Sequence, residues 1–261
     1  KIPSMKKILL TFTLGVATSL AISQTINATN VVELGDTIYQ AEDVSPVLNL
    51  GSAGTGNSWN FSSLLVNKRD TVVFTHPWTT ACAMGTFPTA THRFVQDTLF
   101  GYLSKNTSSL QLLGISDDAN LCVASQDSET VIEFPSSYGS TFFDTSRTTT
   151  TVTGASVGQP SVDSIKVVSE TFIESDFNAS GNLTISYGVF ACIRQDLQRI
   201  TNSDVYGKSA FTGPGFIFLR NEKDTAYSHQ YWSDAANAKF PLVSYDVDAA
   251  GNLTGSVIHT L

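Results

Sequence analysis

The chain has 261 residues, of which 41% are hydrophobic, 10% are aromatic and only 15% are charged, so it can bury a sizeable core and is not disordered. The formal net charge of −8 excludes nucleic acid as a partner, because phosphate binding needs a basic surface. Serine and threonine number 31 each, 62 of the 261 residues, and this excess of small hydroxyl side chains favours strands over helices.

The N-terminal segment has the pattern of a secretory signal peptide. A short basic region at 5–7 precedes an apolar stretch at 8–22, which is shorter than the roughly 20 residues needed to span a membrane. Small residues three positions and one position before Gln24 predict cleavage in front of it. We therefore expect 1–23 to be removed on export, with 1–4 as an upstream extension of the reading frame.

The remaining chain, 24–261, is predicted to be an acidic and soluble extracellular module. It keeps 12 lysines and arginines against 23 aspartates and glutamates, a net charge of −11. No second apolar run approaches spanning length, so we do not expect it to be integral to the membrane.

Short β-type runs alternate with turn signals along the whole of this module, which predicts an all-β fold with minor helix. The expected strands are 31–39, 58–65, 70–75, 91–95, 98–103, 110–115, 130–134, 140–143, 148–153, 164–177, 182–187, 189–200, 215–220, 226–232, 242–245 and 253–260. We expect antiparallel strands packed as a β-sandwich or as strongly curved open sheets. The module is predicted to be a single domain, and 154–163 is the best place for a subdomain boundary.

The run 164–177 shows how these strands are expected to face water. Apolar residues and threonine alternate with charged residues along it, as in a strand with one wet face. Ile165, Val167, Thr171 and Ile173 fall on one face, and Lys166, Glu170 and Glu174 fall on the other.

An odd number of cysteines in an exported chain allows at most one disulfide. Cys82 and Cys122 both lie in polar, loop-like stretches, which makes them the expected pair. Cys192 follows apolar residues and is expected to be a small buried side chain.

A nine-residue pattern, D-x-[N/D]-A-[S/A]-G-N-L-T, occurs at 176–184 and again at 246–254. One interpretation is a pair of calcium loops, with oxygen ligands from Asp176, Asn178, Asp246 and Asp248. The bidentate glutamate of such a loop is missing, because its position holds Tyr187 in one copy and Val257 in the other. A β-hairpin turn is the favoured interpretation, and no metal is expected.

Catalytic motifs are absent from the sequence. The four histidines are too far apart for local metal ligation, no G-x-S-x-G occurs, and the D-T-S at 144–146 has no second copy. No catalytic residue and no cofactor are expected. A hydrolase with a dispersed carboxylate pair remains an alternative, because such pairs need only spatial proximity.

Exposed aromatic side chains are the remaining indication of a ligand. Trp78, Trp232 and Tyr231 could stack on sugar rings, whereas Trp59 alternates with Phe61 and is expected in the core.

The run 51–64, GSAGTGNSWNFSSL, resembles the opening of uncharacterised secreted proteins from Bacteroidetes-type bacteria. The pieces at 133–139, 188–194 and 239–243 fit the same type. The resemblance implies a β-rich exported module, often followed by a C-terminal sorting domain for type IX secretion, which is not visible before Leu261. It implies no catalytic residues.

The sequence therefore favours a secreted, extracellular or cell-surface module with a structural, adhesion or binding role and no catalytic activity. Its expected partner is an extracellular glycan or another surface protein. A carbohydrate-binding protein that uses exposed tryptophan is the first alternative, and the hydrolase is the second.

Overall fold

The structure, a computed structural model, describes residues 24–78, 81–117, 122–209, 213 and 215–261, with the side chains of 81–83 outside that description. The predicted signal peptide lies outside the described residues. The strands are β1 (Thr25–Ile26), β2 (Thr37–Asp43), β3 (Gly54–Asn60), β4 (Lys68–Thr75), β5 (His92–Gln96), β6 (Leu99–Lys105), β7 (Ser109–Asp117), β8 (Cys122–Glu133), β9 (Ser136–Ser137), β10 (Thr141–Thr153), β11 (Ser164–Ile185), β12 (Gly188–Lys208), β13 (Ile217–Trp232), β14 (Val243–Val247) and β15 (Leu253–Thr260).

Helix is minor, as predicted. It comprises α1 (Ala81–Thr86) and two 3₁₀ turns, η1 (Ala28–Asn30) and η2 (Gly154–Val157). None of the helices in the described part of the chain is long and apolar enough to cross a membrane.

The all-β prediction is confirmed, but the predicted sandwich or open sheet is wrong. Twelve described strands form a closed antiparallel barrel in the order β10-β8-β7-β6-β5-β4-β2-β15-β14-β13-β12-β11, and β11 pairs again with β10. The pairing of β10 with β11 runs from Thr141 opposite Asp176 to Thr153 opposite Ser164, and this long ladder joins the two ends of the sheet. Local alternation reports which face of a strand is wet, but it carries no information on which distant strands pair.

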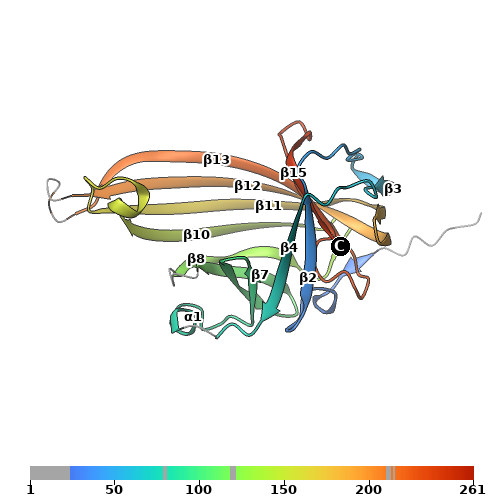
Figure 1. The fold of residues 1–261 in the computed structure, drawn as a ribbon, viewed down its shortest axis with the longest axis horizontal. Coiled ribbons are helices and arrows are strands. Elements are labelled where there is room, and N and C mark those ends of the chain that lie inside the picture. Colours follow the sequence, from blue (N-terminus) through green and yellow to red (C-terminus); the bar gives the residue numbers. More distant parts are fainter. Residues whose placement is uncertain (1–23, 79–80, 118–121, 210–212, 214) are drawn as a thin grey trace, which may run out of the picture.

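Strands β10 to β13 run side by side as a long blade that extends beyond the rest of the barrel (Figure 1). The segment 154–163, where we expected a subdomain boundary, connects β10 to β11 and includes η2. Strands from both sides of this segment belong to the same closed sheet.

Several predicted strands are parts of longer ones in the structure. The runs 164–177 and 182–187 belong to β11, and the runs 215–220 and 226–232 fall mainly within β13. The residues between them had local turn signals, but a long neighbouring strand supplies ladder partners throughout, and tertiary pairing overrides local propensity.

Successive side chains of β13 enter two different cores. Trp232 joins a cluster with residues from strands all around the ring, including Phe74 and Ile132, so this cluster fills the barrel interior. Tyr231 joins a second cluster, in which Trp59 and other residues near β3 cover the opposite face of the sheet. We call the face of the blade strands that carries Trp232 the inner face and the face that carries Tyr231 the outer face.

Candidate functional site

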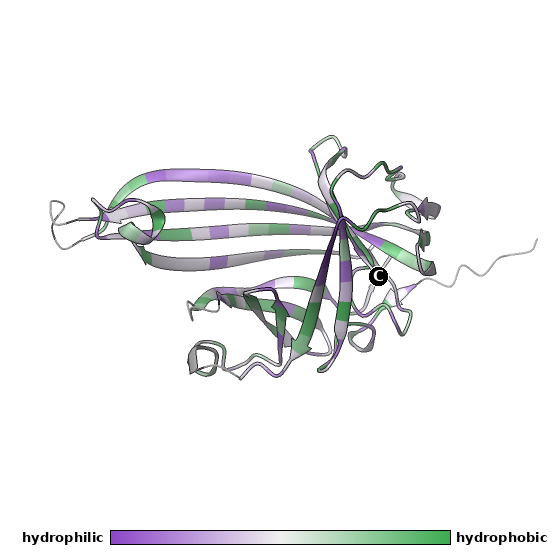
Figure 2. Cartoon of the chain, viewed as in Figure 1, coloured by the Kyte–Doolittle hydropathy of each residue, from purple (hydrophilic) through white to green (hydrophobic). Residues whose placement is uncertain are grey.

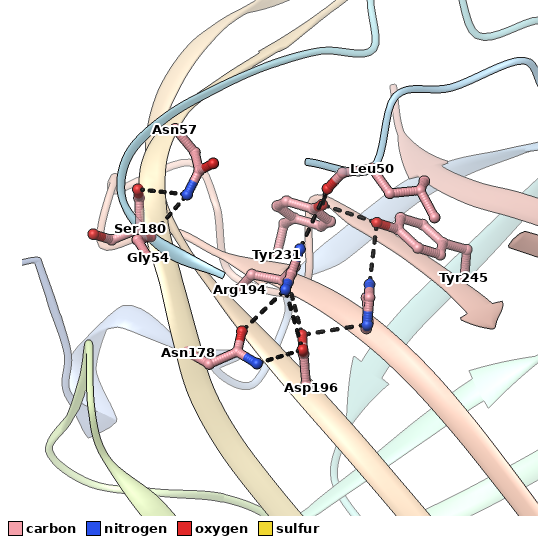
Figure 3. A network of polar contacts seen from close by, with 10 residues as sticks. Leu50, Gly54, Asn57, Asn178, Ser180, Arg194, Asp196, Tyr231 and Tyr245 are labelled. Carbon is pink, nitrogen blue, oxygen red and sulfur yellow. Dashed lines mark hydrogen bonds and ion pairs between the residues drawn. The ribbon is translucent and has the colours of Figure 1, made fainter. Parts of the chain in front are cut away.

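A buried ion pair lies on the outer face of β12. Arg194 and Asp196 are two residues apart on this strand, so their side chains point to the same side. Arg194 Nε donates to Asp196 Oδ1 at 2.7 Å and Arg194 Nη2 donates to Oδ2 at 3.1 Å, a bidentate arrangement (Figure 3). The Arg194 side chain is only 4% exposed, and a buried guanidinium is tolerated because a carboxylate compensates its charge.

A bulge in β11 brings Asn178 to this pair. Between the pairs Asp176–Asp196 and Ala179–Arg194, β11 has two residues where β12 has one. Asn178 Nδ2 donates to Asp196 Oδ2 at 2.6 Å, and Asn178 Oδ1 accepts from Arg194 Nη2 at 3.1 Å (Figure 3). Both oxygens of Asp196 therefore accept hydrogen bonds from neighbouring side chains.

A chain of aromatic side chains continues from Asp196 to the segment before β3. His229 Nε2 lies 3.5 Å from Asp196 Oδ1, and His229 Nδ1 lies 3.3 Å from the hydroxyl of Tyr245. The hydroxyls of Tyr245 and Tyr231 are 2.9 Å apart, and the Tyr231 hydroxyl donates to the carbonyl of Leu50 at 3.5 Å (Figure 3). The network thus links the segment before β3, which contains Leu50, to the sheet.

Burial keeps this network largely uncharged outside the ion pair. Burial lowers the pKa of His229, although the Asp196 carboxylate acts in the opposite direction, so the imidazole is neutral near pH 7. Burial raises the pKa of Tyr231 to about 12 and also raises the pKa of Tyr245. Both phenols therefore stay protonated and available as hydrogen-bond donors.

The lowered pKa of His229 gives a pH prediction. The unfolded chain protonates this histidine at a higher pH than the folded protein does, so stability is expected to fall as the pH drops from 7 to 5. His92, whose pKa is also lowered by burial, contributes in the same direction. The variant His229→Gln should show a smaller loss of unfolding free energy over this range in urea titrations. The exposed-site control is His76→Gln. If the free energy of unfolding of His229→Gln fell with decreasing pH as steeply as that of this control, the assignment would be wrong.

Asp176 is the one carboxyl group of the site whose pKa is raised. It lies opposite Asp196 in the ladder, and its pKa rises through burial first and then through the charges of Asp196 and Glu174. Two neighbouring carboxyl groups, one of them with a raised pKa, are an arrangement that glycosidases use. Here the oxygens of Asp196 are occupied by Arg194 and Asn178, so this carboxylate is not free to attack a substrate or activate water.

Two cavities open on the outer face beside this network. The larger has a volume of about 790 Å³ and is bounded by β7, β8, β10, β11 and β12, and the smaller, of about 250 Å³, lies next to Asp196. Glu174 and Gln198 line both cavities, so the two are adjacent. We refer to them together as the groove.

One end of the groove also carries apolar side chains. Phe143 is 74% exposed and Phe172 is 41% exposed, and with Ile200 they form an apolar patch there. None of the described residues that line the groove is a lysine or arginine. The carboxylates that line it are Asp127, Asp144, Glu174, Asp176, Asp196 and Asp248. The groove is therefore negatively charged along its length and apolar at one end.

Comparisons with protein-family models, curated proteins and solved structures find no match. The resemblance to secreted Bacteroidetes-type proteins therefore stays a prediction, and a functional proposal for this chain rests on the chemistry of the groove.

The predicted sugar-stacking residues lie in different environments. Tyr231 is 0% exposed and Trp232 is 1% exposed, so neither ring offers a solvent-facing surface to a sugar. Trp78 is 58% exposed and retains an accessible ring, but it does not line the groove.

The two copies of the repeated pattern have different structures. The second copy is the predicted hairpin turn between β14 and β15, in which Asp248 Oδ1 accepts from the backbone N–H groups of Ala250 and Asn252. For the first copy the hairpin prediction is wrong, because it lies within β11 and pairs with β12 on one side and β3 on the other.

The four residues of the calcium interpretation have separate roles. Asn178 belongs to the Asp196 network, Asp248 binds its own turn, Asp176 lines the groove and Asp246 is exposed on β14. Within the described part of the chain, no three histidine, cysteine, aspartate or glutamate side chains are grouped so that they could hold a metal ion.

The structure confirms the prediction for one of the three cysteines. Cys192 is free and buried, as predicted, and burial raises the pKa of its thiol. Cys122 is disulfide-bonded. The side chain of Cys82 lies outside the described residues, so its pairing with Cys122 stays a prediction.

The sequence did not indicate most residues of the groove or of the network beside it. These are Phe143 and Phe172 in the groove, Asp196 and His229 in both, and Arg194 in the network. One usable signal was the pattern Arg-x-Asp inside the apolar run 189–200, since two opposite charges on one face of a buried strand predict an ion pair.

Proposed function

We propose that this chain is a secreted, non-catalytic binding module and that the groove holds an extended polypeptide segment with basic and apolar side chains. The observation that carries the proposal is the groove itself, which combines exposed phenylalanines at one end with carboxylates throughout and no lysine or arginine among its described lining residues. A cationic side chain would be attracted along the groove, and an apolar side chain would bury surface on Phe143 and Phe172.

The arrangement of the carboxylates supports binding over catalysis. Asp196 is held by Arg194 and Asn178, and Asp248 is held by its own turn, so these groups are fixed as structural anions. Asp127, Glu174 and Asp176 remain the groups that a ligand cation can approach. The proposed partner is therefore another protein, one of the two partner classes expected from the sequence.

The test uses a fluorescein-labelled decapeptide of lysine, phenylalanine and glycine, with a matched peptide in which glutamate replaces lysine. Fluorescence anisotropy should show binding of the first peptide, weakened by salt, and no binding of the second. The double variant Glu174→Gln/Asp176→Asn should weaken binding by about twofold to thirtyfold, because each exposed ion pair contributes about 0.2–1 kcal/mol. The control Asp97→Asn removes an exposed carboxylate in the turn between β5 and β6, two strands that do not line the groove, and should leave binding unchanged.

The same experiment distinguishes the alternatives. Equal binding of both peptides, or equal loss in the double variant and the control, would overturn the proposal. Quenching of fluorescence by a glycan panel that is lost in Trp78→Ala would instead support the carbohydrate-binding alternative. Cleavage of the peptide that disappears in Asp176→Asn, followed by mass spectrometry, would support the hydrolase.

A further inference from the structure

Strand β13 has a long free edge in the blade. Its ladder with β14 covers only Tyr227 to Tyr231, whereas its ladder with β12 continues to Ile217. On the side away from β12, the part 217–226 therefore has no strand partner among the described residues, and each of its ten residues is exposed. Figure 1 shows this part of β13 at the outer border of the blade.

Such an edge presents unpaired backbone N–H and C=O groups, which are a template for pairing with another strand. Proteins often protect an edge by making it short, bulged or covered. This edge is long, and its first three residues are apolar and open to solvent, with Ile217 46%, Phe218 55% and Leu219 47% exposed. Residues 220–225 are hydrophilic (Figure 2) and carry charges of both signs.

We propose that the edge 217–226 is a dimerisation surface, at which β13 pairs antiparallel with β13 of a second copy of this chain. Charge complementarity favours a second copy of this chain as the partner at this edge. A two-fold axis between two identical antiparallel strands places one residue opposite itself, and its neighbours opposite each other in mirrored order. With Asn221 on the axis, Arg220 of each copy lies opposite Glu222 of the other.

The neighbouring registers are disfavoured by like charges. An axis at residue 220 would place arginine opposite arginine, an axis at 222 would place glutamate opposite glutamate, and an axis at 223 would place lysine opposite lysine. Charge pattern therefore selects one register, centred on Asn221.

The local geometry is compatible with this register. Arg220 and Glu222 already form an ion pair within the strand, with Arg220 Nε 2.5 Å from Glu222 Oε1, and both side chains are more than half exposed. Asn221 donates through Nδ2 to Asp204 at 2.9 Å, which leaves its amide oxygen for the partner. The two blades would join into one continuous sheet of eight strands, four from each copy.

Sedimentation velocity of the purified protein over a concentration range from about 1 to 100 µM tests the proposal. The wild-type protein should dimerise, and Arg220→Glu and Glu222→Arg should each raise the dissociation constant at least tenfold, because each places like charges opposite each other twice. The double variant Arg220→Glu/Glu222→Arg restores opposite charges and should dimerise as the wild type does. Lys68→Glu, an equal charge change at an exposed residue of β4, is the matched control.

All the substituted side chains are exposed, and far-UV circular dichroism confirms that each variant is folded. Amide hydrogen exchange within 217–226 should slow as the wild-type concentration rises, which locates the interface on this edge. A wild-type protein that stays monomeric at 100 µM would overturn the proposal. Single variants that dimerise normally, or a double variant that fails to regain dimerisation, would overturn it as well. The groove lies on a face of the sheet and not on this edge, so peptide binding and dimerisation can fail independently.

Discussion

Replacing Asp196 by asparagine is expected to lower the free energy of unfolding by about 3 kcal/mol. The substitution removes the negative charge beside Arg194, whose side chain is 4% exposed, and leaves the guanidinium charge without compensation in a buried position. Asparagine has nearly the same volume, so the loss reports charge rather than packing. A larger loss is not expected because Asp196 itself is 23% exposed and water screens part of the interaction. Urea denaturation followed by circular dichroism measures the change.

A double variant tests whether the loss of stability in Asp196→Asn comes from the uncompensated charge of Arg194. In Arg194→Met/Asp196→Leu both charges are removed, and we expect a smaller loss than in Asp196→Asn alone, because no unpaired charge remains inside. Glu174→Gln is the matched control, a carboxylate-to-amide change at an exposed position on the same face, with an expected effect within about 0.5 kcal/mol. If Asp196→Asn were no more destabilising than Glu174→Gln, the ion pair would not stabilise the fold.

The sequence was sufficient to predict strands and insufficient to predict how the sheet closes. Alternation in 164–177 correctly separated the two faces of β11 at Ile173, which is buried in the barrel interior, and Glu174, which is exposed. Closure depends on the ladder between β10 and β11, and the length of that ladder is decided by both partners together. The sequence pattern of one strand does not specify which other strand pairs with it.

The repeated pattern shows the same limit at the level of single residues. Gly251 has φ +80 and permits the turn between β14 and β15. Gly181, its counterpart in the first copy, is required for a different reason, because a Cβ there would lie 2.0 Å from the backbone oxygen of Asn57 on β3. Closely similar local sequences therefore take different structures, and the difference comes from the strands that approach them.

The groove was hidden from sequence reasoning because its residues are distant along the chain. Phe143, Phe172 and Ile200 each lie on a different strand and meet only through the ladders of the blade. Asp196 and His229 are likewise brought together by the pairing of β12 with β13. The exposed phenylalanines become informative only in the structure, where they lie together, because contiguous exposed apolar side chains often mark an interaction site.

Replacing Trp232 by alanine is expected to lower the free energy of unfolding by about 3–5 kcal/mol. The ring is 1% exposed inside the barrel and packs edge-on against Phe240, with the ring centres 6.3 Å apart. Its Nε1 donates to Gln195 Oε1 at 2.7 Å, so alanine would leave both a cavity and an unsatisfied buried acceptor. Chemical denaturation of the two proteins under identical conditions gives the difference.

Two further variants decide which property of Trp232 is responsible. Trp232→Phe keeps most of the buried ring but loses the donor to Gln195, and should cost about 1–2 kcal/mol. Trp78→Ala removes a ring that is 58% exposed and should change stability by less than about 0.5 kcal/mol. Because the sequence presents both tryptophans as similar ligand-stacking residues, unequal costs would show that Trp232 serves the barrel interior. Equal costs for Trp232→Ala and Trp78→Ala would contradict the placement of Trp232 in that interior.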